Sequence, residues 1–542
     1  MSLALFFAGL VISGEGAQPM KIDSVELCGL TGSVNNMAFV YERYVIVAPY
    51  APKTLVTDES TLEEFDNHYL YLIDTKRPDL GIQKTDLKCY YPTRLIYDAG
   101  AGVAFVRGTR YEQVGGKYEP VEVISHVRIN LDDNGKPTFG NAITFDVKGI
   151  DSDRANDALP DLGLSKRGNV LVFGNGATVY TFTLNEGYIY NVSLLSAAEY
   201  SQDNSISYLD VDEATNTLVA VVNRRERKED GGVKEYSTLR FYSLRDDGTI
   251  DLKKKIEPDK FPAGTALTAG SNVVIVPGPP DPSTGYESIN SAYFVTNDGS
   301  LYVADLTEGN SLAADPFDAP LRQLDTIPEL AQSDPENASA RILKYDAQKK
   351  ILTIVKRGNI SQIRRPFYGR PGRPGNIRRP FYARVAESPA VVFAQFGKKN
   401  SKLSGVKVFT DEFEEGDGLS TLAIGPGAAP SFATYSGRLY SVNLPDNVSG
   451  ATLDNVGQIG ERIDNLAFSP QRNSYVSINS FRANEEGTEI EQPGVLSVAK
   501  LLNNGNVPTS PGLFQSLTSI SLGIDKVIPS IRRPVNIGRP AR

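Results

Sequence analysis

The chain of 542 residues contains no tryptophan, two histidines and two cysteines. With so few nitrogen and sulfur ligands, and no Cys-x-x-Cys pair, a zinc centre is not expected. His126 lies in the β-branched run 121–129 and His68 precedes another apolar run, so both positions favour a structural role. The sequence also lacks a Gly-x-Ser-x-Gly elbow, a phosphate-binding glycine-rich loop and a dinucleotide fingerprint. We therefore predict no catalytic residues, no metal ligands and no cofactor.

No apolar run reaches the length needed to cross a bilayer. An apolar stretch over residues 3–13, followed by small residues, is typical of the hydrophobic part of a secretory signal peptide, although no Lys or Arg precedes it. We predict a signal peptide over residues 1–17 and a protein that is secreted or displayed at the cell surface. The alternative is a buried N-terminal strand.

A secreted protein would meet an oxidising compartment, in which Cys28 and Cys89 are expected to form a disulfide. Such a bond would close a loop of about 60 residues and contribute about 4 kcal/mol in the chain-entropy model. Two unrelated buried thiols are the alternative. Chance alone would give about as many Asn-X-Ser/Thr sequons as the chain contains. These candidate glycosylation sites are Asn191, Asn337, Asn359 and Asn447.

Helical periodicity is almost absent, and short β-branched and aromatic runs alternate with Gly, Asp, Asn and Pro, which indicates an all-β fold. One unit repeats: a short strand, a polar turn opened by Asp or Ser, and a stronger apolar strand. The spacing of about 60 residues predicts a β-propeller over 18–530, with eight blades favoured and seven if one weak copy is spurious. A two-domain β-sandwich is the alternative. Clear copies cover 95–106, 208–222, 343–355 and 466–478, and weaker copies begin near Met37, Leu162, Ala266 and Leu422.

One copy carries a family resemblance. Residues 292–305 read Ala-Tyr-Phe-Val-Thr-Asn-Asp-Gly-Ser-Leu-Tyr-Val-Ala-Asp and resemble the YVTN-type propeller repeat. The resemblance implies a propeller fold, and lactonase-like members of that group would hold a metal in the central channel. A metal-dependent propeller hydrolase is therefore the alternative function, with Asp210, Asp212 and Asp346 as conspicuous acids. Quinone-dependent propellers are excluded, because their blade-docking tryptophans are missing.

Two further expectations follow from a ring fold. Residues 22–28 precede the first unit and should supply the outer strand that completes the last blade. The connection between the second and third strands of each unit is often long, and such loops tend to carry function. Equivalent loops emerge on one face, which we take as the candidate binding face. The long connections are 50–67, 109–119, 224–236, 277–291, 357–388 and 482–493.

Charge is divided unevenly along the chain. The net charge is −9, yet seven arginines and no acid occur between 359 and 386, and four arginines and no acid occur in 531–542. The motif Ile-Arg-Arg-Pro recurs in both segments, which we call the basic arms: the insert 357–388 and the tail 531–542. Pro and Gly keep such segments extended, and their arginines and aromatic rings suit anion binding and stacking. The predicted binding residues are Arg364, Arg365, Phe367, Tyr368, Arg370, Arg373, Arg378, Arg379, Phe381, Tyr382, Arg384, Arg532, Arg533, Arg539 and Arg542.

The basic arms favour binding or assembly over chemistry. Docked on the acidic body of a neighbouring copy or on another acidic protein surface, they would build an open filament or matrix. Alternatively, they would grip an anionic polysaccharide, while nucleic acid is the least expected polyanion. The alternative is that the insert is a solvated linker and the C-terminal segment a solvated tail, whose charges only increase solubility.

Overall fold

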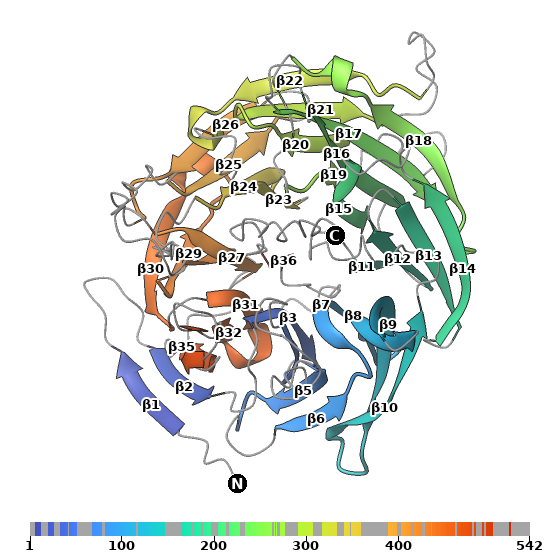
Figure 1. Ribbon diagram of the computed structural model, residues 1–542. Helices are drawn as coiled ribbons and strands as arrows, with labels where there is room; N and C mark the ends of the chain where they lie inside the picture. Colours follow the sequence, from blue (N-terminus) through green and yellow to red (C-terminus); the bar gives the residue numbers. More distant parts are fainter. Residues whose placement is uncertain are drawn as a thin grey trace, which may run out of the picture.

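A computed structural model gives the fold (Figure 1). It describes residues 6–11, 20–26, 33–41, 43–50, 68–77, 82–114, 117–146, 164–167, 169–175, 178–185, 188–196, 204–212, 216–227, 233–262, 265, 267, 271–276, 291–306, 317–332, 341–346, 348–358, 388–397, 403–413, 417–424, 429–434, 436–460, 463–479, 482–483, 490–492, 495–501 and 520–521.

Within these residues the chain forms eight antiparallel sheets of four or five strands, arranged in a ring (Figure 1). We call the sheets blades 1 to 8 in chain order. Blade 1 contains β3 (Ser33–Val40), β4 (Tyr44–Tyr50), β5 (Tyr69–Asp74) and β6 (Gln83–Asp86). Blade 2 contains β7 (Tyr90–Asp98), β8 (Val103–Val114), β9 (Lys117–Leu131) and β10 (Pro137–Asp146). Blade 3 contains β11 (Leu164–Arg167), β12 (Val170–Asn175), β13 (Thr178–Asn185) and β14 (Tyr188–Ser196).

The next three blades repeat this strand order. Blade 4 contains β15 (Asn204–Asp212), β16 (Thr217–Arg227), β17 (Val233–Leu244) and β18 (Ile250–Ile256). Blade 5 contains β19 (Val274–Val276), β20 (Ser291–Val295), β21 (Ser300–Asp305) and β22 (Leu321–Thr326). Blade 6 contains β23 (Arg341–Asp346), β24 (Ile351–Lys356), β25 (Ala390–Phe396) and β26 (Leu403–Phe409).

The last two blades recruit strands from the chain ends. Blade 7 contains β27 (Leu419–Ile424), β28 (Pro430–Thr434), β29 (Arg438–Asn443), β30 (Thr452–Gln458) and β36 (Ile520–Ser521). Blade 8 contains β31 (Ile463–Ser469), β32 (Ser474–Asn479), β35 (Val495–Leu501), β2 (Met20–Glu26) and β1 (Phe6–Val11). Short 3-10 helices are η2 (Pro258–Lys260), η3 (Pro328–Leu330), η6 (Val448–Gly450) and η7 (Pro470–Arg472), and β33 (Arg482–Ala483) pairs with β34 (Ile490–Gln492).

The burial of each strand depends on its place in the blade. The second strand of blade 6, β24, is buried at all six positions, because neighbouring blades cover both of its faces. The outermost strand of blade 5, β22, has no buried position. The apolar core therefore lies between adjacent blades, as where Leu343 and Leu352 of blade 6 pack with Tyr293 and Val295 of blade 5. The predicted all-β propeller is confirmed by this strand order.

The repeated polar turn joins the first and second strands of a blade. At its last position the backbone is left-handed, with φ of 64° at Gly102, 56° at Asn216, 55° at Lys350 and 49° at Asn473. Asp346 opens its turn by accepting backbone N–H bonds from residues 348 and 349 at 2.9 and 3.1 Å. The Asp-opened pattern is thus a backbone requirement of the turn.

Ring closure follows the expectation from sequence. β2 pairs antiparallel with β35 along its whole length, from Met20 opposite Leu501 to Glu26 opposite Val495. Blades 8 and 1 also share a core cluster that includes Val476 and Val45. The apolar stretch expected to be the core of a signal peptide contributes β1, which pairs with β2 as a fifth strand. Removal of residues 1–17 would leave β2 in place, and the signal peptide stays a prediction.

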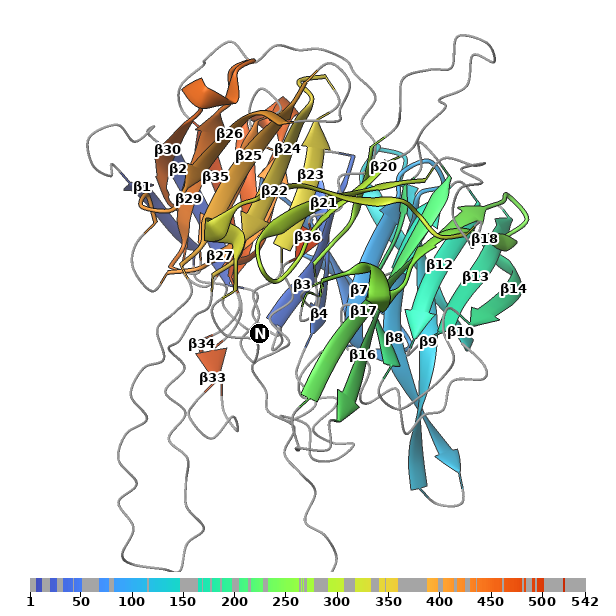
Figure 2. The same ribbon diagram turned by 90° about the horizontal axis from the view of Figure 1, so that it is seen from above.

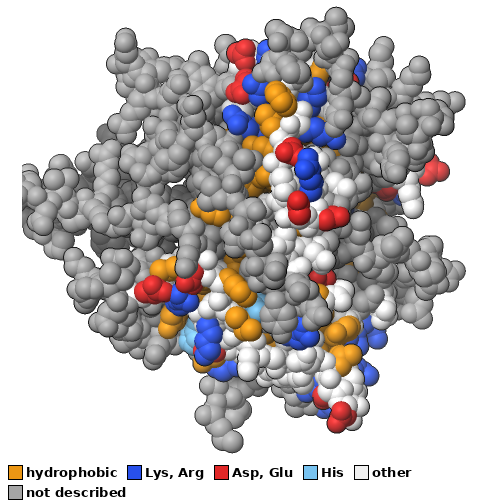
Figure 3. All heavy atoms as spheres, turned by 90° about the vertical axis from the view of Figure 1, so that its right-hand side faces the viewer, with side chains coloured by type: hydrophobic (Ala, Val, Ile, Leu, Met, Phe, Trp, Pro, Cys, Tyr) orange, Lys and Arg blue, Asp and Glu red, His pale blue; other side chains and the backbone are white. Residues whose placement is uncertain are grey.

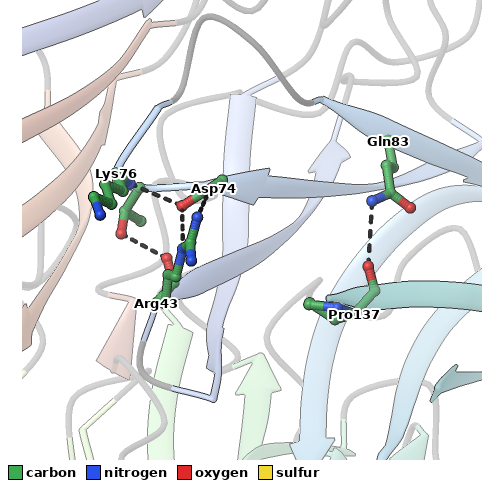
Figure 4. Close-up of polar contacts among 6 residues, drawn as sticks. Arg43, Asp74, Lys76, Gln83 and Pro137 are labelled. Atoms are coloured by element: carbon green, nitrogen blue, oxygen red, sulfur yellow. Dashed lines mark hydrogen bonds and ion pairs between the residues drawn. The ribbon is translucent and has the colours of Figure 1, made fainter. Parts of the chain in front are cut away.

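Polar contacts at the periphery reinforce blade 1 (Figure 4). Arg43 Nε donates to Asp74 Oδ1 at 2.8 Å, and a second guanidinium nitrogen contacts the other carboxylate oxygen. Gln83 at the start of β6 donates to the carbonyl oxygen of Pro137 at 3.2 Å, linking the outermost strands of blades 1 and 2. Neighbouring blades are therefore joined by polar contacts as well as by the core.

Cys89 is a buried free thiol that lies just before β7. A Cβ added at Gly108 would lie 2.6 Å from its Sγ, so glycine is required for this close approach. Burial raises the pKa of the Cys89 thiol, which keeps it protonated. Cys28 lies outside the described residues, and the Cys28–Cys89 disulfide stays a prediction.

Candidate functional site

The two faces of the ring carry different connections. Strand direction alternates within a blade, so connections between second and third strands, and from one blade to the next, leave at one face, which we call the insert face. Five of the six long connections lie between second and third strands, as expected. The connection 277–291 does not: it joins β19 to β20, the first and second strands of blade 5, so that prediction was wrong. The first strand of this blade is Val274–Val276, which begins later in the sequence than the predicted start of the repeat near Ala266.

Two of the expected loops are mostly strand. Residues 109–119 extend β8 and β9 into a long hairpin, with Val114 opposite Lys117. Residues 224–236 extend β16 and β17, where the register sets Arg225 opposite Glu235. These hairpins and the small β33–β34 pair project on the same side of the ring (Figure 2). The insert face is therefore built partly from paired hairpin strands.

The basic insert leaves blade 6 at this face. Lys356, the last residue of β24, is the register partner of Ala390, the first residue of β25. The Lys356 ammonium donates to the carbonyl oxygens of Glu329 and Ala331 at 3.2 and 2.7 Å, and the Arg357 carbonyl oxygen accepts from Leu419 N at 2.8 Å. The base of the insert is thus fixed against blade 7 and the segment before blade 6.

The segment that leads to the basic tail enters the centre of the ring. β36 pairs with the innermost strand of blade 7, with Ser521 opposite Thr421 and Ile520 opposite Leu422. First strands run away from the insert face, and β36 is antiparallel to β27, so β36 runs toward the insert face. The described strands that precede the two basic arms, β24 and β36, therefore run toward the same face. The predicted binding residues in 364–384 and 532–542 lie outside the described residues.

A polar cluster on the inner strands contains Asp210, one of the conspicuous acids of the sequence, together with residues that sequence analysis did not select. Tyr208 on β15 donates to Asp210 Oδ2 at 3.0 Å. Burial raises the pKa of Tyr208 well above its ordinary value, Asp210 adds to the rise, and the positive charge of Arg94 on β7 opposes it. Arg94 is the register partner of Arg107, and Arg107 Nε donates to Glu122 Oε2 at 3.2 Å in a buried pair. Such groups meet only through the fold, and no linear motif marks them.

Carboxylates that could suggest a metal serve as turn residues where the structure describes them. Asp132 accepts from the backbone N–H groups of residues 134 and 136 at 2.9 and 2.8 Å. Hydrogen bonds from Thr249 lower the pKa of Asp247 in the turn after β17. The described part of the chain holds no group of three or more His, Cys, Asp or Glu side chains placed to bind a metal.

The histidines and sequons occupy ordinary structural positions. His126 on β9 is buried against Phe105 and Phe145, and burial lowers its pKa. His68 packs on the ring of Tyr69, with 4.0 Å between centroids. Asn447 is exposed and accepts from Ser449 N at 3.0 Å, and Asn191 lies in β14. Asn337 and Asn359 lie outside the described residues.

The face drawn in Figure 3 does not separate the two signs of charge on its described residues. In the view from the right-hand side of Figure 1, Lys and Arg side chains lie among Asp and Glu side chains (Figure 3). Across the described residues, no helix has the length and apolar character of a membrane span.

Comparisons place the chain near propellers of known structure. No protein-family model and no curated protein matches it. The chain is similar to the Dos1 propeller, at 9% identity and a TM-score of 0.47, over 90% of this chain and 95% of that one. It is also similar to the RRP9 WD40 repeats, at 10% identity and a TM-score of 0.36, over 88% of this chain and 97% of that one. A similarity to Raptor of Chaetomium thermophilum has 12% identity and a TM-score of 0.36, and covers 87% of this chain and 28% of that one. Our assignment of the fold is based on the strand order, and the YVTN resemblance of 292–305 stays an interpretation.

Proposed function

We propose that this chain is a secreted or surface-exposed binding propeller that engages an acidic partner through its two basic arms. The direction of the two described anchors carries the proposal. β24 ends at the insert face before 357–388, and β36 runs toward the same face before 531–542. Two arginine-rich segments whose preceding strands run toward one face can engage one partner together, which raises their effective concentration.

The favoured partner is a second copy of this chain. The arms hold twelve arginines and one glutamate, a net charge of +11, and the remainder of the chain therefore has a net charge near −20 (−9 − 11), so each copy offers both halves of a charge-complementary contact. Arms of one molecule on the body of the next would build a filament or matrix. An anionic polysaccharide would use the same arginines.

Light scattering after size exclusion tests the proposal. Deletion of 359–387 leaves Arg357, Gly358, Ser388 and Pro389 as a four-residue hairpin loop between register partners, a length that hairpins accept. Large species that form with the intact protein at low salt, and disappear after arm deletion or at high salt, would support self-assembly. If every form stays monomeric, self-assembly is wrong. Binding of the intact protein, but not the arm-deleted protein, to immobilised heparin would then identify a polysaccharide partner.

A further inference from the structure

Two arginines of blade 2, Arg94 and Arg107, lie side by side, and one carboxylate, that of Glu122, pairs with Arg107. Arg94 and Arg107 are register partners on β7 and β8, so their side chains leave the same face of the sheet. Arg107 is paired with Glu122, and the exposed fractions of these side chains are 3% and 7%. Arg94 forms no side-chain hydrogen bond or ion pair with the residues that the structure describes, and its Nε is buried without a partner. Among the described residues, Glu122 thus pairs with Arg107 and no ion pair is formed by Arg94.

The position of Arg94 allows a ligand to reach it. β7 is the innermost strand of blade 2, and Arg94 as a whole is partly exposed. Its positive charge acts to lower the pKa of Tyr208 on β15, the innermost strand of blade 4. The four-residue strand β11 of blade 3 lies between these two blades in chain order. Asp210, which Tyr208 holds by a hydrogen bond, is exposed. The inner strands thus present a guanidinium on blade 2 and, two blades further on, a carboxylate on blade 4.

We propose that Arg94 anchors a binding site in the channel for a small carboxylate. Buried cationic groups in proteins are paired, and a guanidinium binds a carboxylate through two parallel hydrogen bonds. An anion at Arg94 would supply the ion-pair partner that the described residues do not, and would accept from the buried Nε. The nearby charge of Asp210 disfavours a phosphate dianion, so a singly charged carboxylate fits the site better. This site is independent of the basic arms and of their partner.

Thermal unfolding of the full chain in sodium acetate, against sodium chloride at equal ionic strength, tests the site. For a chain of this length, a single bound anion at ten times its dissociation constant should raise Tm by about 1 °C. The rise should saturate in the wild type and in the control Arg77→Gln, which changes an exposed turn residue. It should disappear in Arg94→Gln and shrink in Arg94→Lys, which keeps the charge without the planar fork.

Each outcome decides the proposal. Equal acetate responses in the wild type and Arg94→Gln would overturn the site. A larger response to inorganic phosphate than to acetate would overturn the carboxylate assignment. In chloride alone, Arg94→Gln should raise Tm, because it removes a charge that has no ion-pair partner among the described residues; a fall of the same size in both salts would show that Arg94 only supports the fold.

Discussion

The side-chain amide of Asn272 forms two hydrogen bonds with the backbone of Leu343. Nδ2 donates to the carbonyl oxygen at 2.9 Å, and Oδ1 accepts from the backbone N–H at 2.6 Å. Asn272 precedes β19 in blade 5, and Leu343 lies in β23, the innermost strand of blade 6. A single side chain thus satisfies both backbone groups of a residue on the neighbouring blade, as an adjacent strand would.

Replacement of Asn272 by Ala should therefore weaken the contact between blades 5 and 6. Two buried hydrogen bonds are lost and the Leu343 backbone groups are left unsatisfied, so the free energy of unfolding should fall by about 2–3 kcal/mol. Asn443→Ala, at an exposed strand end, is the matched control. Urea denaturation measures both, and equal midpoints for the two variants would contradict the role given to Asn272.

The sequence predicted those parts of the fold that depend on local pattern. Alternating apolar runs and Asp-opened turns indicated the blades, and residues 22–28 indicated the closing strand. The strand β36 was not predicted, because two residues carry no periodicity, and its pairing depends on the inner edge of β27. The position of Arg94 opposite Arg107 was also missed, since it depends on the register of β7 against β8. Local chemistry is visible in a sequence, but contacts between distant strands are not.

The buried pair of Arg107 and Glu122 offers a test of charge compensation. Glu122→Leu removes the carboxylate that accepts from the buried Arg107 and should cost about 3–5 kcal/mol. The double variant Arg107→Met/Glu122→Leu removes both charges and should recover most of this loss. Asp251→Ala, which breaks an exposed pair with Arg245, should cost less than about 1 kcal/mol. Chemical denaturation that shows the double variant to be as unstable as the single variant would refute the argument.

Lys344 on β23 should make stability depend on pH. Burial lowers its pKa to about 8, and the negative charge of Asp346 only partly opposes the fall. In the unfolded chain a lysine keeps a pKa of about 10.4. Between pH 8 and 10.4 the folded state therefore binds fewer protons than the unfolded state, and the contribution of Lys344 to stability rises with pH. Below pH 8 its burial carries the full penalty.

Lys344→Met should consequently stabilise the protein at pH 7, by on the order of 2–3 kcal/mol, and the gain should shrink as the pH approaches 10.4. The exposed Lys136→Met serves as the control, for which no pH-dependent gain is expected. Denaturation midpoints of the three proteins at pH 7 and pH 10 provide the measurement. A gain that is the same at both pH values would show that Lys344 does not titrate in this way.

The closing strand β2 should be essential and β1 dispensable. β35 pairs with β2 along its full length, and its residues Leu496, Val498 and Leu501 are buried. Deletion of residues 1–26 leaves the backbone edge of β35 without its ladder partner and should cost on the order of 5 kcal/mol, since each backbone hydrogen bond contributes about 0.5–1.5 kcal/mol. Deletion of 1–17 alone keeps β2, so its denaturation midpoint should stay near that of the full chain. Equal losses for the two deletions would mean that β1 is an integral strand of blade 8, and the predicted removal of 1–17 would then be incompatible with a stable ring.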